Sequence, residues 1–148
     1  MGAKNISVHA IAEASANAEV ILIAAVPQAV KDIATQLGDV SNKIIIDAMN
    51  SVRTKPEPFS NTTEALLNLT NCKDIVKCFN TTGAENMANP IYHGKGIDMF
   101  YAGDSGLIAV KSLNKFEVIL SKLLHFQSSQ SWKSSFVLVI GIVYLFRM

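Results

Sequence analysis

The sequence predicts an α/β protein built on a parallel sheet with helices on both faces. Three short apolar runs, at residues 20–26, 43–47 and 74–79, have the composition of buried strands. Their apolarity is continuous rather than alternating, which is typical of parallel strands covered on both sides. Helical patterns lie between the runs, and alternation of strand and helix is the pattern of a parallel sheet with right-handed crossovers.

Composition excludes several classes of protein. Of the 148 residues, 49% are hydrophobic and only 17% are charged, so the chain is expected to fold around a core. The net charge is +1, which argues against nucleic acid as a partner. Cys72 and Cys78 are too few for a disulfide-built domain. Cys78 lies inside an apolar run and is expected to be a small core residue.

The first run is closed by Pro27, which also begins the next element. After it, one helical face is predicted from residues spaced by three, one and three: Val30, Ile33, Ala34 and Leu37. Gly38 is expected to end this helix, because glycine adopts the backbone conformation that follows many helices.

A second helix is predicted to begin after Asn61. With Asn61 as the cap, Glu64 falls three residues later, as a capping box requires. Leu66, Leu67 and Leu69 are expected to form the apolar side of this helix. Further along, residues 98–102 are predicted to form a short fourth strand, and a helix is expected to begin near Gly106.

The C-terminal run Phe136–Phe146 contains no charge. Its 11 residues fall short of the roughly 20 that a bilayer-spanning helix needs, so no membrane span is predicted. The run is rich in β-branched residues and fits either a buried strand or an aggregation-prone tail. No secretory signal pattern opens the sequence, and a cytoplasmic location is expected.

Polar and turn-forming residues follow each of the three predicted strands. Ligands of parallel α/β sheets bind at the carboxyl ends of the strands. The segments at those ends are Ala25-Val26-Pro27, Asp47-Ala48-Met49-Asn50 and Phe79-Asn80-Thr81-Thr82-Gly83.

These segments resemble the NADP-dependent oxidoreductases that use the deazaflavin coenzyme F-420. The resemblance is carried by Val-Ile-Leu-Ile-Ala-Ala-Val-Pro, by Ile-Ile-Ile-Asp-Ala-Met-Asn and, most specifically, by Ile-Val-Lys-Cys-Phe-Asn-Thr-Thr-Gly-Ala-Glu-Asn-Met-Ala. Residues 98–104 fit the same family, and the match runs from about Ala3 to Val110. The nucleotide-binding domain of membrane metalloreductases is a more distant relative with the same fold.

The resemblance implies a partial Rossmann-like sheet. Residues 1–127 would form a truncated NAD(P)-binding domain, and residues 128–148 a divergent hydrophobic tail. The family's first three strands and its Gly-rich phosphate-binding turn have no counterpart in the sequence, so the chain is expected to be a fragment. Loss of the first strand would leave the run Val20–Val26 at an exposed sheet edge, and self-association through that edge is expected. The alternative is that the run Phe136–Phe146 covers this edge as an added strand.

The resemblance also implies NADP as the cofactor and coenzyme F-420 or a flavin as the second coenzyme. Hydride would pass directly between the two rings, so no catalytic acid or base is expected. The adenosine half of the dinucleotide would contact Ala25, Val26 and Pro27. The nicotinamide ribose would lie near Asp47 and Asn50. The nicotinamide pocket would be lined by Asn80, Thr81, Gly83 and Ala84.

Each of these residues has a plainer interpretation. Asp47 fits a cap of the loop that follows it, and Asn80 and Thr81 fit an ordinary turn. Lys77 alternates with Val76 and Cys78 and fits a solvated strand position. The corresponding alternative function is a non-catalytic fragment or binding module that does not bind a dinucleotide.

Overall fold

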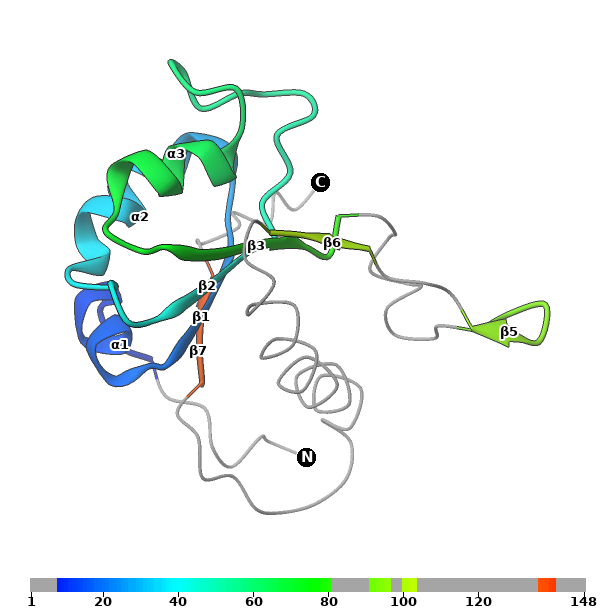
Figure 1. Ribbon diagram of the computed structural model, residues 1–148, viewed down its shortest axis with the longest axis horizontal. Coiled ribbons are helices and arrows are strands. Elements are labelled where there is room, and N and C mark those ends of the chain that lie inside the picture. The colour runs from blue at the N-terminus through cyan, green and yellow to red at the C-terminus, as the bar shows by residue number, and fades with distance from the viewer. Residues whose placement is uncertain (1–7, 81–90, 97–99, 104–135, 141–148) are drawn as a thin grey trace, which may run out of the picture.

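The computed structural model describes residues 8–80, 91–96, 100–103 and 136–140. These residues form a mixed α/β fold (Figure 1) with a five-stranded sheet in the order β6-β3-β2-β1-β7 and a separate two-stranded pair, β4-β5. The strands are β1 Val20–Ala24, β2 Ile44–Asp47, β3 Asp74–Cys78, β4 Ile91–Tyr92, β5 Lys95–Gly96, β6 Tyr101–Ala102 and β7 Phe136–Ile140. The helices are α1 Ile11–Asn17, the 3-10 turn η1 Pro27–Ala29, α2 Val30–Leu37 and α3 Thr62–Leu69.

The three predicted apolar strands are confirmed as parallel neighbours. In β1 and β2, Ile23 pairs with Asp47, and in β2 and β3, Asp47 pairs with Lys77. The short strand β6 departs from the expected parallel pattern, because Tyr101 lies opposite Cys78 in an antiparallel pair. An antiparallel neighbour needs no crossover helix, which is why the chain can return to β3 at this edge.

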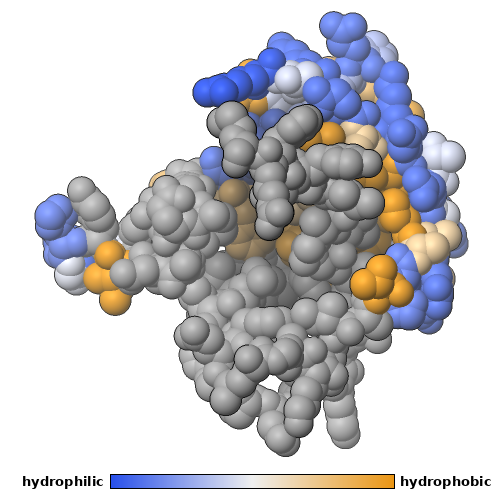
Figure 2. Space-filling model, turned by 180° about the vertical axis from the view of Figure 1, so that it is seen from behind, coloured by the Kyte–Doolittle hydropathy of each residue, from blue (hydrophilic) through white to orange (hydrophobic). Residues whose placement is uncertain are grey.

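The described helices α1, α2 and α3 all cover the same face of the sheet (Figure 1). As predicted, α2 buries one face and is followed by Gly38, whose φ of 69° ends the helix. Apolar residues are also buried on the opposite face of the sheet, where they form a second cluster: Val20, Leu22, Ile46, Val76 and Cys78. Helices on both faces are not seen among the described residues, and the helix expected near Gly106 lies outside them. In Figure 2 hydrophilic side chains lie along the upper and right-hand rim. Hydrophobic side chains lie inside this rim and also at the lower right and far left of the view.

Helix α3 begins as predicted but packs through a different side. The Asn61 side chain accepts a hydrogen bond from the Glu64 backbone nitrogen at 2.9 Å, which confirms the cap. The predicted apolar side was wrong in part, because Leu67 and Leu69 are 44% and 41% exposed. Helical spacing explains the difference, since the buried positions recur every three or four residues: Thr62, Ala65 and Leu66.

The C-terminal run contributes a strand to the sheet. Strand β7 pairs in parallel with β1 over five residues, from Val20 opposite Phe136 to Ala24 opposite Ile140. Strand β1 therefore lies between β2 and β7 and is not an edge strand. The expectation of an exposed edge at this strand is wrong, because β7 pairs with the backbone groups of residues 20–24 that were expected to be free. Self-association of the chain stays a prediction. The domain division at residue 127 stays a prediction.

Two described elements have no counterpart in the sequence prediction. One is α1, and the other is the β4-β5 hairpin, which stands away from the sheet (Figure 1). His93 and Gly94 have φ values of 50° and 76° and make the two-residue turn of this hairpin. Within the described part of the chain, no helix has the length and apolarity to cross a bilayer.

Candidate functional site

The carboxyl ends of β1, β2 and β3 meet at one edge of the sheet, as the parallel register requires. The backbone nitrogen of Ala48, just after β2, donates to the carbonyl of Ile23 in β1 at 2.9 Å. The loop after β2 is thereby joined to β1 two residues before the first predicted segment begins. Asn80, from the third segment, donates from Nδ2 to the carbonyls of Ala48 at 3.3 Å and Met49 at 3.1 Å.

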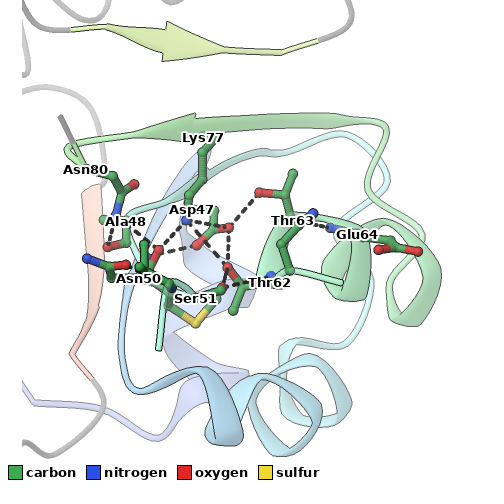
Figure 3. A network of polar contacts seen from close by, with 12 residues as sticks. Asp47, Ala48, Asn50, Ser51, Thr62, Thr63, Glu64, Lys77 and Asn80 are labelled. Atoms are coloured by element: carbon green, nitrogen blue, oxygen red, sulfur yellow. Dashed lines mark hydrogen bonds and ion pairs between the residues drawn. The ribbon is translucent and has the colours of Figure 1, made fainter. Parts of the chain in front are cut away.

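Asp47 is the centre of the polar network at this edge (Figure 3). Its side chain is fully buried. One carboxylate oxygen, Oδ1, accepts from the backbone nitrogen of Met49 at 2.9 Å. The other, Oδ2, accepts from the hydroxyls of Thr62 and Thr63, both at 2.7 Å. The carboxylate therefore joins the end of β2 to the start of α3, and it caps the following loop as the plainer interpretation predicted.

Lys77 completes the network from β3. Its ammonium nitrogen lies 3.2 Å from Asp47 Oδ2 and 3.5 Å from the Thr62 hydroxyl, and it also donates to the Met49 carbonyl. The Lys77 side chain is 28% exposed, so the expected solvated strand position is confirmed only in part. Residues two apart in a strand share a face, and Ile75 packs in the cluster beneath the helices. Lys77 therefore reaches the helix-covered side of the sheet, where Asp47 lies.

The loop after β2 is held by its own side chains. Asn50 is exposed, and its Oδ1 accepts from the backbone nitrogen of Val52 at 3.2 Å. The Ser51 hydroxyl donates to the Thr62 hydroxyl at 3.3 Å and accepts from the Thr62 backbone nitrogen at 3.2 Å. Asn50 thus stabilises the loop locally, while Ser51 ties it to α3.

The remaining predicted site residues fall into two groups. At the end of β1, Ala25 is half-buried, Val26 is 57% exposed, and Pro27 is buried as the first residue of η1. Val26 therefore presents an apolar side chain to solvent at the expected edge of the sheet. The second group lies outside the described residues: Thr81, Gly83 and Ala84.

Asn80 carries the one unsatisfied polar atom of the network. Its Oδ1 is buried, and among the described residues no donor lies within hydrogen-bonding distance of it. Buried acceptors are usually paired, so this oxygen marks the place where the site offers a hydrogen bond to something else. Its Nδ2 is already bonded to two carbonyls.

The start of α3 places a second carboxylate beside the network. The Ser60 hydroxyl and backbone nitrogen both donate to Glu64 Oε2, the latter at 2.8 Å. These hydrogen bonds lower the pKa of Glu64 below its ordinary value, the Ser60 hydroxyl having the larger effect. The Glu64 carboxylate therefore forms part of the cap of α3.

A hollow of about 280 Å³ opens at the other end of the strands. Its lining residues precede or adjoin the starts of β1 and β2: Ala18, Glu19, Asp39, Ser41, Asn42 and Lys43. The Lys43 ammonium here donates to the carbonyls of Ala16 and Ala18 at 3.2 and 2.7 Å. This hollow does not coincide with the strand-end residues that the sequence predicts.

The strand-end residues fit a dinucleotide in part. Exposed Val26 offers an apolar contact for a ring, and Asn80 Oδ1 offers an acceptor. Both Asp47 oxygens are committed to contacts within the chain, so its carboxylate acts on the loop rather than as a ribose acceptor. Nothing among the described residues forms a glycine-rich phosphate cradle.

Sequence reasoning missed three members of the network: Ser51, Thr62 and Thr63. Two hydroxyl residues directly after a predicted helix cap are a usable signal, because that position faces the strand ends in an α/β fold. The partner at the strand end, Asp47, lies 15 and 16 residues earlier, beyond the reach of local pattern. In comparisons with known proteins, no family model, curated protein or solved structure matches the chain.

Proposed function

We propose that the chain belongs to an NAD(P)-dependent oxidoreductase that transfers hydride between NADP(H) and a deazaflavin or flavin-type acceptor. The carboxyl-end edge of β1, β2 and β3 would bind the dinucleotide. The observation that supports the proposal is the contact between the second and third predicted segments. There Asn80 Nδ2 donates to the carbonyls of Ala48 and Met49, while its buried Oδ1 has no hydrogen-bond partner among the described residues. Parallel sheets bind ligands at this edge.

Direct hydride transfer would require the protein mainly to position the two coenzyme rings. When bound, NADPH would supply a hydride to the acceptor ring, which would also take up a proton from water. Asn80 would accept a hydrogen bond from the ligand, and Val26 would cover an apolar ring. The network of Asp47, Lys77 and Thr62 would hold the loop that these two residues flank. Such fixed positioning is the main contribution a protein makes to a direct hydride transfer.

The test is titration of the folded chain with NADPH by calorimetry, compared with Asn80→Leu and with Asn68→Leu. Asn68 is exposed near the end of α3, away from the strand-end loops, and its amide donates to the Glu64 carbonyl. We expect saturable NADPH binding by the wild type and by Asn68→Leu, and weaker binding by Asn80→Leu. Absence of saturable binding to the folded wild type, with NADPH and with NADH, would overturn the proposal.

A second candidate is a non-catalytic binding module that does not take a dinucleotide. The full commitment of the Asp47 carboxylate to internal hydrogen bonds favours it, because such a network also serves stability alone. The two candidates are separated by mixing the chain with NADPH and either a flavin or a deazaflavin. Loss of the NADPH absorbance band in step with added protein supports the oxidoreductase, and unchanged absorbance with no binding supports the module.

A further inference from the structure

Two donors from the end of β3 converge on a single carbonyl oxygen. The Lys77 ammonium and the Asn80 amide nitrogen both donate to the carbonyl of Met49, in the loop after β2. Lys77 is itself held by Asp47, whose Oδ2 lies 3.2 Å from the ammonium nitrogen. The Asp47 carboxylate thus contacts the Lys77 ammonium, which donates to the same Met49 carbonyl that accepts from Asn80.

This carbonyl decides which way the Asn80 amide points. An amide has a donor end and an acceptor end, and neighbouring groups select between the two orientations. The reversed orientation would place Oδ1 against the carbonyl oxygens of Ala48 and Met49, where two acceptors would repel. The observed orientation gives Nδ2 both carbonyls and leaves Oδ1 buried without a donor among the described residues.

We infer that Lys77 is a positioning residue that fixes the Met49 carbonyl and thereby holds the Asn80 amide with its acceptor end toward the ligand. The site then selects ligands that bring an N–H or O–H donor to this oxygen over those that bring none. The orientation of the amide follows from the geometry alone. The identity of the donor rests on the proposed function, under which it is the carboxamide NH₂ of the nicotinamide ring.

The orientation is tested without any ligand, on Lys77→Met and the matched control Lys43→Met. Lys43 is also an ammonium donor to two backbone carbonyls, but at the opposite end of the strands. Nitrogen–proton NMR of the Asn80 side-chain NH₂ reports its hydrogen bonds through the exchange of its protons with water. We expect slow exchange in the wild type and in Lys43→Met, and exchange at least tenfold faster in Lys77→Met. Equal exchange in all three proteins overturns the inference.

A second substitution covers the case in which Lys77→Met does not fold. Lys77→Gln keeps a neutral donor with a shorter reach and should show the same faster exchange at Asn80. Thermal melts of each variant establish that the amide is measured in folded protein. If Lys77→Gln folds and its Asn80 protons exchange as slowly as those of the wild type, Lys77 does not position the amide.

Selectivity is tested with NADPH and its 3-acetylpyridine analogue, which replaces the carboxamide NH₂ by a methyl group. Leaving a buried acceptor unpaired is costly, so the wild type should bind NADPH roughly tenfold more tightly than the analogue. In Lys77→Met the ratio should fall, because the Met49 carbonyl is no longer fixed and the Ala48 carbonyl is left as the fixed acceptor for the amide. A loss of affinity that is equal for both ligands, with the ratio unchanged, would show only a structural role. Failure of the wild type to bind either ligand, with Asn80 exchange still dependent on Lys77, overturns the proposed function but supports the positioning role.

Discussion

Asp47 and Lys77 are register partners in neighbouring parallel strands, and their side chains form an ion pair with 3.2 Å between Oδ2 and Nζ. The carboxylate is fully buried, whereas the lysine side chain keeps 28% of its surface in solvent. The hydrogen-bond and ion-pair partners of the Asp47 carboxylate come from three elements: the loop after β2, the start of α3 and β3. The pair is the point at which these elements are joined.

Removing the carboxylate should destabilise the fold. Asp47→Ala leaves the hydroxyls of Thr62 and Thr63 without their acceptor and the Lys77 ammonium without its counter-charge. Loss of one partner of a buried pair is strongly destabilising, and partial exposure of Lys77 moderates the effect, so we expect about 3 kcal/mol less free energy of unfolding. Urea denaturation measures it. The control Asp32→Ala, at an exposed position in the first turn of α2, should cost no more than about 1 kcal/mol. Equal losses in the two variants would contradict the role given to Asp47.

The cap of α3 should give the protein a dependence on acid pH. Hydrogen bonds from Ser60 hold the pKa of Glu64 below its ordinary value of 4.5. A lowered pKa means that the carboxylate favours the folded state above pH 4.5, and that this contribution is lost as pH falls through the lowered pKa. Carbon NMR titration of Glu64 should show this pKa rising toward 4.5 in Ser60→Ala. The control Ser51→Ala removes a different hydroxyl near α3 and should leave the pKa of Glu64 unchanged.

The contribution of Cys78 to folding stability should be lost at alkaline pH, whereas that of Glu64 is lost at acid pH. Burial raises the pKa of its thiol to about 11, from an ordinary value of 9.0. Above pH 9.0 the unfolded state loses the thiol proton that the folded state keeps. The contribution of Cys78 to folding stability is therefore complete below pH 9.0 and is lost as pH rises toward 11. Urea denaturation across this range should show a smaller fall in stability for Cys78→Val than for the wild type. Parallel curves for the two proteins would show that Cys78 does not contribute.

The same burial should protect both thiols from modification. Cys72 and Cys78 are each 1% exposed, and burial also raises the pKa of Cys72. A thiolate is the reactive form, so a maleimide should label neither residue in the folded protein at neutral pH. Labelling should appear with the urea unfolding transition. Rapid labelling of the single variants Cys72→Ala or Cys78→Ala in native buffer would contradict the burial of the thiol that remains.

Local sequence signals predicted much of the sheet and its helices. Three of these signals depend on residues within a few positions of one another. They are the end of the first apolar run at Pro27, the end of α2 at Gly38, and the cap of α3 formed by Asn61 and Glu64. Helix α1 carries a weaker signal, because Ser15 is the one residue that it fully buries. Without an apolar stripe, periodicity does not distinguish such a helix from a loop.

The candidate site was harder to predict, because its contacts are long-range. Asp47 and Asn80 were predicted from their place at strand ends. The role of Lys77 depends on a partner 30 residues away. Alternation in β3 correctly places Lys77 opposite Val76 and Cys78, but it does not say that α3 and Asp47 cover that face. The partial burial of this lysine depends on its partners, and periodicity carries no information about them.

The pairing of β7 with β1 predicts an effect of shortening the chain. A chain ending at residue 135 lacks β7 and exposes the backbone groups of β1 along residues 20–24. An uncovered apolar strand invites pairing with another chain. Sedimentation velocity should therefore detect larger species for this chain than for one ending at Ile140, which keeps β7. The matched pair separates loss of the strand from loss of the residues beyond it. If both shortened chains sediment as monomers at the same concentration, β7 does not protect β1 from association.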